Sequence, residues 1–171
     1  MVKWAYILIG NDKTGKTTFQ KELIQHITGS YKTKLYCNLI FPIEIRIGSR
    51  NSQTISFMNR SYQEKDSKYD TVQEFFTSDF KDTDIAILSS HLCKTDIEEM
   101  IRELKKRFFN VEGVFFENSI ALDYAVNQDI SLLEWDERYF VQNPTTKDEA
   151  AQKNMIRKSA LEFGYHILNK T

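Results

Sequence analysis

The sequence lacks the features that mark membrane, secreted and nucleic-acid-binding proteins. Its 23 Lys and Arg nearly cancel its 24 Asp and Glu, so no overall field attracts nucleic acid or a membrane surface. Cys37 and Cys93 lie far apart and form no CxxC pair, which favours a reducing compartment. The apolar run at residues 4–9 is too short to span a bilayer, and no signal-peptide cleavage region follows it. We therefore expect a cytoplasmic protein with no membrane partner, and nucleic acid is not indicated.

The sequence also lacks an internal repeat, a low-complexity tract and a linker. Its 171 residues, 41% of them hydrophobic, therefore predict a single domain over residues 1–171. The apolar run 4–9 predicts a central parallel strand, and the four-residue spacing of Phe19, Leu23 and Ile27 predicts a helix from Lys16 to about Thr28. Further strands are predicted at residues 34–41, 43–47, 54–58, 85–88, 111–116 and 138–142, and further helices at 72–80, 97–108, 119–127 and 148–168.

The segment between the first predicted strand and the first predicted helix carries the chemical signal. Residues 10–17 read Gly-Asn-Asp-Lys-Thr-Gly-Lys-Thr and match the phosphate-loop (P-loop, Walker A) pattern G-x-x-x-x-G-K-[ST] without a mismatch. Glycines let the loop amides turn inward, and the helix N-terminus adds positive potential for phosphate oxygens. We expect Lys16 to neutralise the β- and γ-phosphates and Thr17 to offer its hydroxyl to Mg2+.

This motif predicts ATP, or another nucleoside triphosphate, as the ligand, together with Mg2+. The expected binding residues are Gly10, Asn11, Asp12, Lys13, Thr14, Gly15, Lys16, Thr17 and Thr18. Because strands alternate with helices around the motif, we predict a three-layer α/β P-loop NTPase fold with a mainly parallel sheet flanked by helices.

The interior of the loop resembles a known family. Residues 10–18, Gly-Asn-Asp-Lys-Thr-Gly-Lys-Thr-Thr, are similar to the phosphate loop of thymidylate kinases, in which an acidic and often a basic residue precede the second glycine. The resemblance covers these nine residues and implies that Asp12 orients the substrate sugar and Lys13 stabilises the transferred phosphoryl group. The alternative is a solvated charge pair at the tip of a loop.

A second resemblance follows the predicted strand at 54–58. Asn59-Arg60-Ser61-Tyr62 is similar to the Asp-Arg-Ser/Tyr/His signature of nucleoside and nucleotide kinases, with Asn59 in place of the Asp. In that family the acid assists the magnesium shell or the substrate, and the arginine grips a phosphate. The resemblance implies that Arg60 is a phosphate clamp through bidentate donation, and the alternative is an ordinary solvent-facing arginine.

An acidic residue at the C-terminal end of a second apolar strand, the usual Walker B partner of magnesium, is not evident. Asp84 precedes its strand, whereas Glu117 follows Val-Phe-Phe at the correct end, so we predict Glu117 as a metal ligand beside Thr17; the alternative is the start of a polar loop. His91 also follows a predicted strand. It either senses the γ-phosphate, positions a water, or caps the next helix.

The sequence therefore favours a kinase-type transferase that moves a phosphoryl group from ATP to a nucleoside or nucleotide. Lys16, Lys13 and Arg60 are expected to stabilise charge while Asp12 orients the small-molecule acceptor. One alternative is a nucleotide hydrolase or switch, although its D-x-x-G and N-K-x-D strings are absent. The other is a nucleotide-binding assembly protein that has lost catalysis, which Asn59 favours. The acceptor, the choice of ATP or GTP and a homodimeric state stay open.

Overall fold

The computed structural model describes residues 2–35, 38–43, 54–64 and 68–170. Its six-stranded sheet has the order β2-β3-β4-β1-β5-β6. The strands are β1 (Lys3–Ile9), β2 (Leu39–Pro42), β3 (Thr54–Met58), β4 (Ile85–Ser90), β5 (Phe109–Phe116) and β6 (Glu137–Val141). The helices are α1 (Lys16–Thr28), α2 (Val72–Ser78), α3 (Lys94–Lys106), α4 (Glu117–Leu122), α5 (Tyr124–Ser131) and α6 (Glu149–Lys170), with a 3-10 turn, η1 (Tyr62–Glu64).

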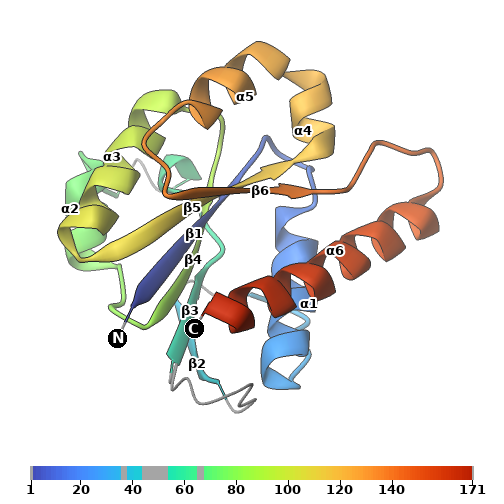
Figure 1. Ribbon diagram of the computed structural model, residues 1–171, viewed down its shortest axis with the longest axis horizontal. Coiled ribbons are helices and arrows are strands. Elements are labelled where there is room, and N and C mark those ends of the chain that lie inside the picture. The colour runs from blue at the N-terminus through green and yellow to red at the C-terminus, as the bar shows by residue number, and fades with distance from the viewer. Residues whose placement is uncertain (1, 36–37, 44–53, 65–67, 171) are drawn as a thin grey trace.

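The sheet is mainly parallel, as the alternation of strands and helices predicts. Strand β1 pairs in parallel with β4 and β5, and β3 and β6 continue the sheet in parallel on either side. Strand β2 runs antiparallel to β3 at one edge. The predicted α/β class, with helices flanking a mainly parallel sheet, is confirmed (Figure 1).

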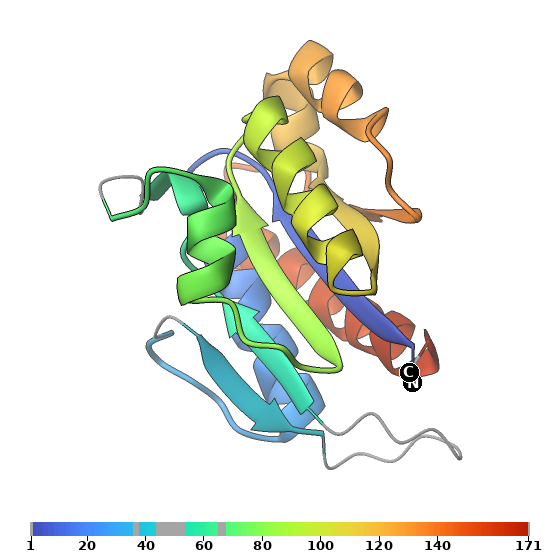
Figure 2. The ribbon, with the colours of Figure 1, turned by 90° about the vertical axis from the view of Figure 1, so that its left-hand side faces the viewer.

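The central strand β1 is apolar along its length because helices cover both faces of the sheet. Its alternate side chains point to opposite faces, so Ala5 and Ile7 pack with α2 and α3, whereas Tyr6 and Leu8 pack with α1 and α6. Figures 1 and 2 show α1 and α6 together on one side of the sheet and α2 and α3 on the other. The two apolar layers hold β1 in place, so the loop that follows its carboxyl end begins from a fixed position.

Among the predicted elements, one strand and one helix differ clearly from the structure, and a second strand lies almost wholly outside the described residues. The strand expected at 34–41 begins only at Leu39 and ends at Pro42, which an edge strand tolerates because its outer amides need no partner. The strand expected at 43–47 lies, apart from Ile43, outside the described residues. The single helix expected at 119–127 is two helices, α4 and α5, which meet at Asp123.

The parallel strands place several loops at one edge of the sheet. The segments that follow β1, β3, β4, β5 and β6 all leave from carboxyl ends, where ligands of open α/β sheets bind. None of the helices in the described part of the chain combines the length and the apolar character needed to cross a bilayer.

Candidate functional site

The P-loop joins the end of β1 to the start of α1, and its backbone is held in one conformation. Gly10 donates its N–H to the Ser90 carbonyl at 3.2 Å, and a Cβ at Gly10 would lie 2.8 Å from Thr14 Oγ1. Gly15 is the N-cap of α1 with φ 95°, and a Cβ there would lie 2.6 Å from Ile156 Cδ1. Gly10 is therefore favoured by space, and Gly15 by its left-handed backbone, since the Ile156 side chain could move aside.

Two buried asparagines fasten the loop from below. Asn118 Nδ2 and Asn143 Nδ2 donate to the Thr14 carbonyl at 3.2 and 2.9 Å, and the Asn118 backbone N–H donates to Asn143 Oδ1 at 3.4 Å. Asn118 lies in the first turn of α4, directly after β5, and Asn143 follows β6, so the ends of both strands are tied to the loop. Sequence analysis did not find these residues, because 104 and 129 positions separate them from Thr14 and no motif marks them.

Lys16 lies across the mouth of the loop. Its Nζ donates to the Gly10 carbonyl and, at 2.8 Å, to the Asn11 carbonyl. Burial lowers the pKa of Lys16 to about 8, while the negative charges of Asp12 and Glu64 act in the opposite direction. An ammonium that is partly stripped of water and bonded only to neutral carbonyls is well placed to exchange those partners for phosphate oxygens.

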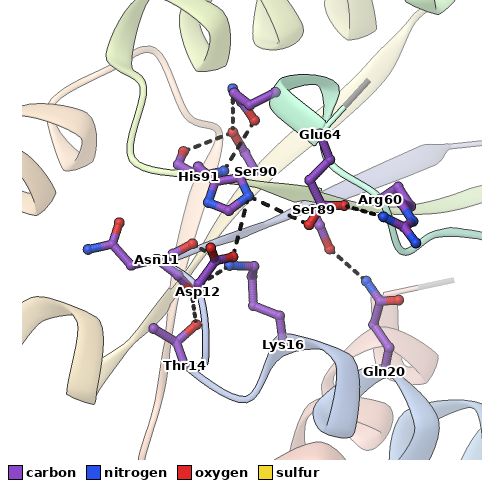
Figure 3. A network of polar contacts seen from close by, with 12 residues as sticks. Asn11, Asp12, Thr14, Lys16, Gln20, Arg60, Glu64, Ser89, Ser90 and His91 are labelled. Carbon is purple, nitrogen blue, oxygen red and sulfur yellow. Dashed lines mark hydrogen bonds and ion pairs between the residues drawn. The ribbon is translucent and has the colours of Figure 1, made fainter. Parts of the chain in front are cut away.

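A cleft of about 270 Å³ opens over the loop. It is lined by the P-loop residues from Asn11 to Thr18 and, on the opposite wall, by Asn59, Ser61, Glu64, Ser89 and His91. Figure 3 shows Asp12, Glu64 and His91 converging above Lys16. The structure thus brings together the P-loop residues that the motif predicts.

Two predicted residues lie elsewhere. Arg60 lies outside the lining of this cleft in the described part of the chain; its side chain is 61% exposed, with Nη1 3.9 Å from Glu64 Oε2. Glu117 is exposed and lines a separate cavity of about 510 Å³ with Phe140 and Pro144. The structure therefore does not bring Glu117 into the cleft that Thr17 lines, and its metal role stays a prediction.

Asn59 has a structural contact in place of a free carboxylate. Its Nδ2 donates to the Leu35 carbonyl at 3.1 Å, which ties the segment after β3 to the segment before β2. In the resembling family an acid at this position assists the magnesium shell or the substrate. The neutral amide of Asn59, which donates to a carbonyl, cannot replace the charge of that acid.

His91 lies between two acidic residues. Its Nε2 is 3.8 Å from Asp12 Oδ1 and 3.7 Å from Glu64 Oε1. The N-cap of α3 is Cys93, so the capping alternative for His91 is wrong. The His91 backbone N–H donates to Gln63 Oε1 at 3.3 Å, which links the segment after β4 to η1, where Glu64 lies. No sequence signal marks Glu64, because it lies in a polar segment just beyond the kinase resemblance that follows β3 and belongs to no pattern itself.

The chemistry of the site suits an anion with several oxygens. Helix α1 begins at a glycine, which offers no side chain to cap its amides, and its first turn Lys16-Thr17-Thr18 contains no acid. The exposed Lys13, with φ 63°, adds a second ammonium at the rim. Helix dipole, free amides and two ammonium groups together favour a polyphosphate.

The comparisons with known proteins name no family for the chain. No protein-family model matches it, and a search of curated proteins also gives no match.

Proposed function

We propose that the chain is a P-loop nucleotide-binding protein that transfers a phosphoryl group from ATP to a nucleoside or nucleotide. One observation carries the proposal: a complete phosphate loop joins the central strand to an uncapped helix N-terminus, beneath a cleft with Lys16 at its mouth. The P-loop NTPase fold is part of the same proposal. The order of strand, loop and helix and the parallel sheet support it.

The residues present fit a nucleoside triphosphate and Mg2+. A Cβ at Gly10 would lie 2.8 Å from Thr14 Oγ1, and the φ of 95° at Gly15 disfavours a side chain there, so the loop keeps a bare backbone cradle of the kind that phosphate oxygens require. Lys16 would neutralise the β- and γ-phosphates, and Thr17, which is exposed in the cleft, would hold Mg2+ through its hydroxyl. Bound Mg2+ supplies charge neutralisation between the phosphates.

The wall opposite the loop would receive the acceptor. Asp12 has an 81% exposed side chain above the loop, and an acceptor hydroxyl bonded to its carboxylate would face the γ-phosphate. Transfer then forms a bond from the acceptor oxygen to the γ-phosphorus and breaks the bond to the bridging oxygen, releasing ADP. Lys16 and Lys13 stabilise the charge on the oxygens of the transferred group.

The decisive experiment compares Lys16→Ala with Lys21→Ala by calorimetric titration with ATP and Mg2+. Lys21 lies one turn further along α1 and outside the cleft lining in the described part of the chain. Loss of a charge-assisted contact should weaken binding by about 10- to 100-fold for Lys16→Ala alone. Unchanged affinity of Lys16→Ala would overturn the proposal. ADP release measured with a panel of nucleosides and nucleotides then tests transfer, which requires release that depends on the acceptor.

A second candidate is a nucleotide-binding protein without catalysis. The contact of Asn59 with the Leu35 carbonyl and the exposure of Arg60 favour it, because neither residue lends charge to the cleft. Tight ATP binding with no ADP release from any acceptor would select this function over the kinase.

A further inference from the structure

The cleft contains a group of metal-ligating side chains, Asp12, Glu64 and His91, of which the proposed function uses only Asp12. Asp12 Oδ1, Glu64 Oε1 and His91 Nε2 all lie within 4.8 Å of one another. They come from three segments, the P-loop, η1 and the segment after β4, which meet at the carboxyl edge of the sheet (Figure 3). Three different parts of the chain thus direct one nitrogen and two oxygens at a shared point.

The atoms of this group lie too far apart for hydrogen bonds and close to the separation of metal ligands. His91 Nε2 is 3.8 and 3.7 Å from the two carboxylate oxygens, whereas hydrogen bonds measure about 2.7 to 3.2 Å. Bonds of about 2.1 Å from a metal to nitrogen and oxygen place neighbouring ligand atoms about 3.0 to 3.4 Å apart. A movement of a few tenths of an ångström would therefore bring His91 Nε2 to ligand spacing from each carboxylate oxygen, and all three ligand atoms already lie within 4.8 Å of one another.

A buried hydroxyl in the same cleft supplies an independent observation. Ser61 lines the cleft and is 1% exposed, and its Oγ has no hydrogen-bond partner among the described residues. A hydroxyl removed from water without a partner is costly, and a cation or its bound water would satisfy it. The neighbouring ammonium of Lys16 does not fill this role, since it is committed to the carbonyls of Gly10 and Asn11.

We propose that Asp12, Glu64 and His91 hold a divalent first-row transition-metal cation, of the class of Mn2+, Co2+ and Zn2+, in the cleft before nucleotide binds. The imidazole nitrogen selects such ions over Mg2+ and Ca2+, which prefer oxygen alone. Three protein ligands leave coordination positions free for phosphate oxygens or water. The use of this ion with a nucleotide rests on the proposed function, but its binding does not.

The test is calorimetric titration of the full chain with Co2+ in the absence of nucleotide. We expect one Co2+ to bind per chain, and we expect the affinity for Mg2+ to be lower than that for Co2+ by at least about tenfold. Because even residues that only orient ligands contribute about 10- to 100-fold to metal affinity, His91→Gln should weaken Co2+ binding by about 100-fold and erase the preference over Mg2+. Glu64→Gln, a second variant, should weaken it similarly.

The chain offers a matched control in His166→Gln. His166 also belongs to a group of one histidine and two glutamates, but an ammonium already bonds those glutamates, so Co2+ affinity should not change. Three results would each overturn the proposal. These are failure of the unaltered chain to bind Co2+, equal affinities of that chain for Co2+ and Mg2+, and a His91→Gln variant that keeps the Co2+ affinity of the unaltered chain. Lys16→Ala separates the two ideas, because it should lose ATP and keep Co2+. Co2+ binding without any ATP binding would refute the proposed function alone.

Discussion

The protein contains two clusters of one histidine and two acids, and they differ in how completely they are satisfied. In the cluster on the sheet, Glu112 is fully buried, accepts from His166 Nε2 at 2.9 Å and from Lys170 Nζ at 2.7 Å, and Lys170 also bonds Glu137. In the cluster over the P-loop, His91 Nε2 is 3.8 Å from Asp12 Oδ1 and 3.7 Å from Glu64 Oε1, beyond hydrogen-bond distance.

The same residue types therefore have different roles in the two clusters: the buried one stabilises the fold, and the one over the P-loop is available to a ligand. Lys170 is the built-in cation of the buried cluster, and its contacts attach the last turn of α6 to β5 and β6. Burial raises the pKa of Tyr6 well above its ordinary value, and the charges of Glu112 and Glu137 raise it further. The charge of this cluster therefore reaches a side chain of the core.

The cleft cluster is open to water, and the cation beside it is held more loosely: the exposed Arg60 has its Nη1 3.9 Å from Glu64 Oε2, against 2.7 Å between Lys170 Nζ and Glu112 Oε2. This looser pairing suits an ion that comes from solution.

The largest effect expected from this contrast is on stability. Glu112→Gln removes the buried carboxylate that Lys170 and His166 contact and leaves the Lys170 ammonium without its buried partner, so we expect the free energy of unfolding to fall by about 3 kcal/mol. Urea unfolding at neutral pH measures this. The matched change Glu64→Gln, in the exposed cluster, should alter it by less than about 0.5 kcal/mol. Equal losses from the two variants would show that both clusters are structural.

Sequence reasoning succeeded where the signal is local. The apolar run before Gly10, the four-residue spacing after Lys16 and the alternation of strands with helices each depend on neighbouring residues, and the structure has β1, α1 and the parallel sheet there. The P-loop residues also share one cleft, because they are contiguous.

The rest of the site depends on contacts that sequence spacing does not encode. Asn118 and Asn143 reach Thr14 only because β5 and β6 end beside the P-loop. Glu64 meets His91 because η1 folds against the end of β4. Glu117 shows the limit of a local pattern: it follows a strand, as a metal ligand would, and its side chain lines another cavity, so its metal role stays a prediction.

A pH titration sharpens the contrast at the P-loop. Since burial lowers the pKa of Lys16 to about 8, the free protein loses the ammonium above that pH, whereas bound phosphate favours its charged form. The dissociation constant for ATP should be constant at lower pH and rise by up to about tenfold per pH unit above about 8, as uptake of one proton requires.

The carboxylates above the loop determine the pH at which the dissociation constant for ATP begins to rise. The charge of Glu64 raises the pKa of Lys16, so Glu64→Gln should move the onset to lower pH. Glu112→Gln should leave the onset unchanged, because the pKa of Lys16 is shifted by burial, Asp12 and Glu64 and not by Glu112. An ATP affinity that is flat across the pKa of Lys16 would contradict the role of the ammonium.

The smallest effect expected is that of Glu117→Gln, and it decides between two assignments of the cation. If Glu117 completes the magnesium shell with Thr17, as its position after β5 predicts, its neutralisation should weaken ATP binding in Mg2+ by about tenfold. If the cation lies at Asp12, Glu64 and His91, the same change in a separate cavity should alter ATP and Co2+ affinities by less than about twofold, as for other surface substitutions. Parallel calorimetric titrations of Glu117→Gln and Glu64→Gln measure both. We expect the second outcome, because an exposed carboxylate can serve an ion in the cleft only if the cleft includes it, and the residues that line this cleft place Glu64 there and Glu117 elsewhere.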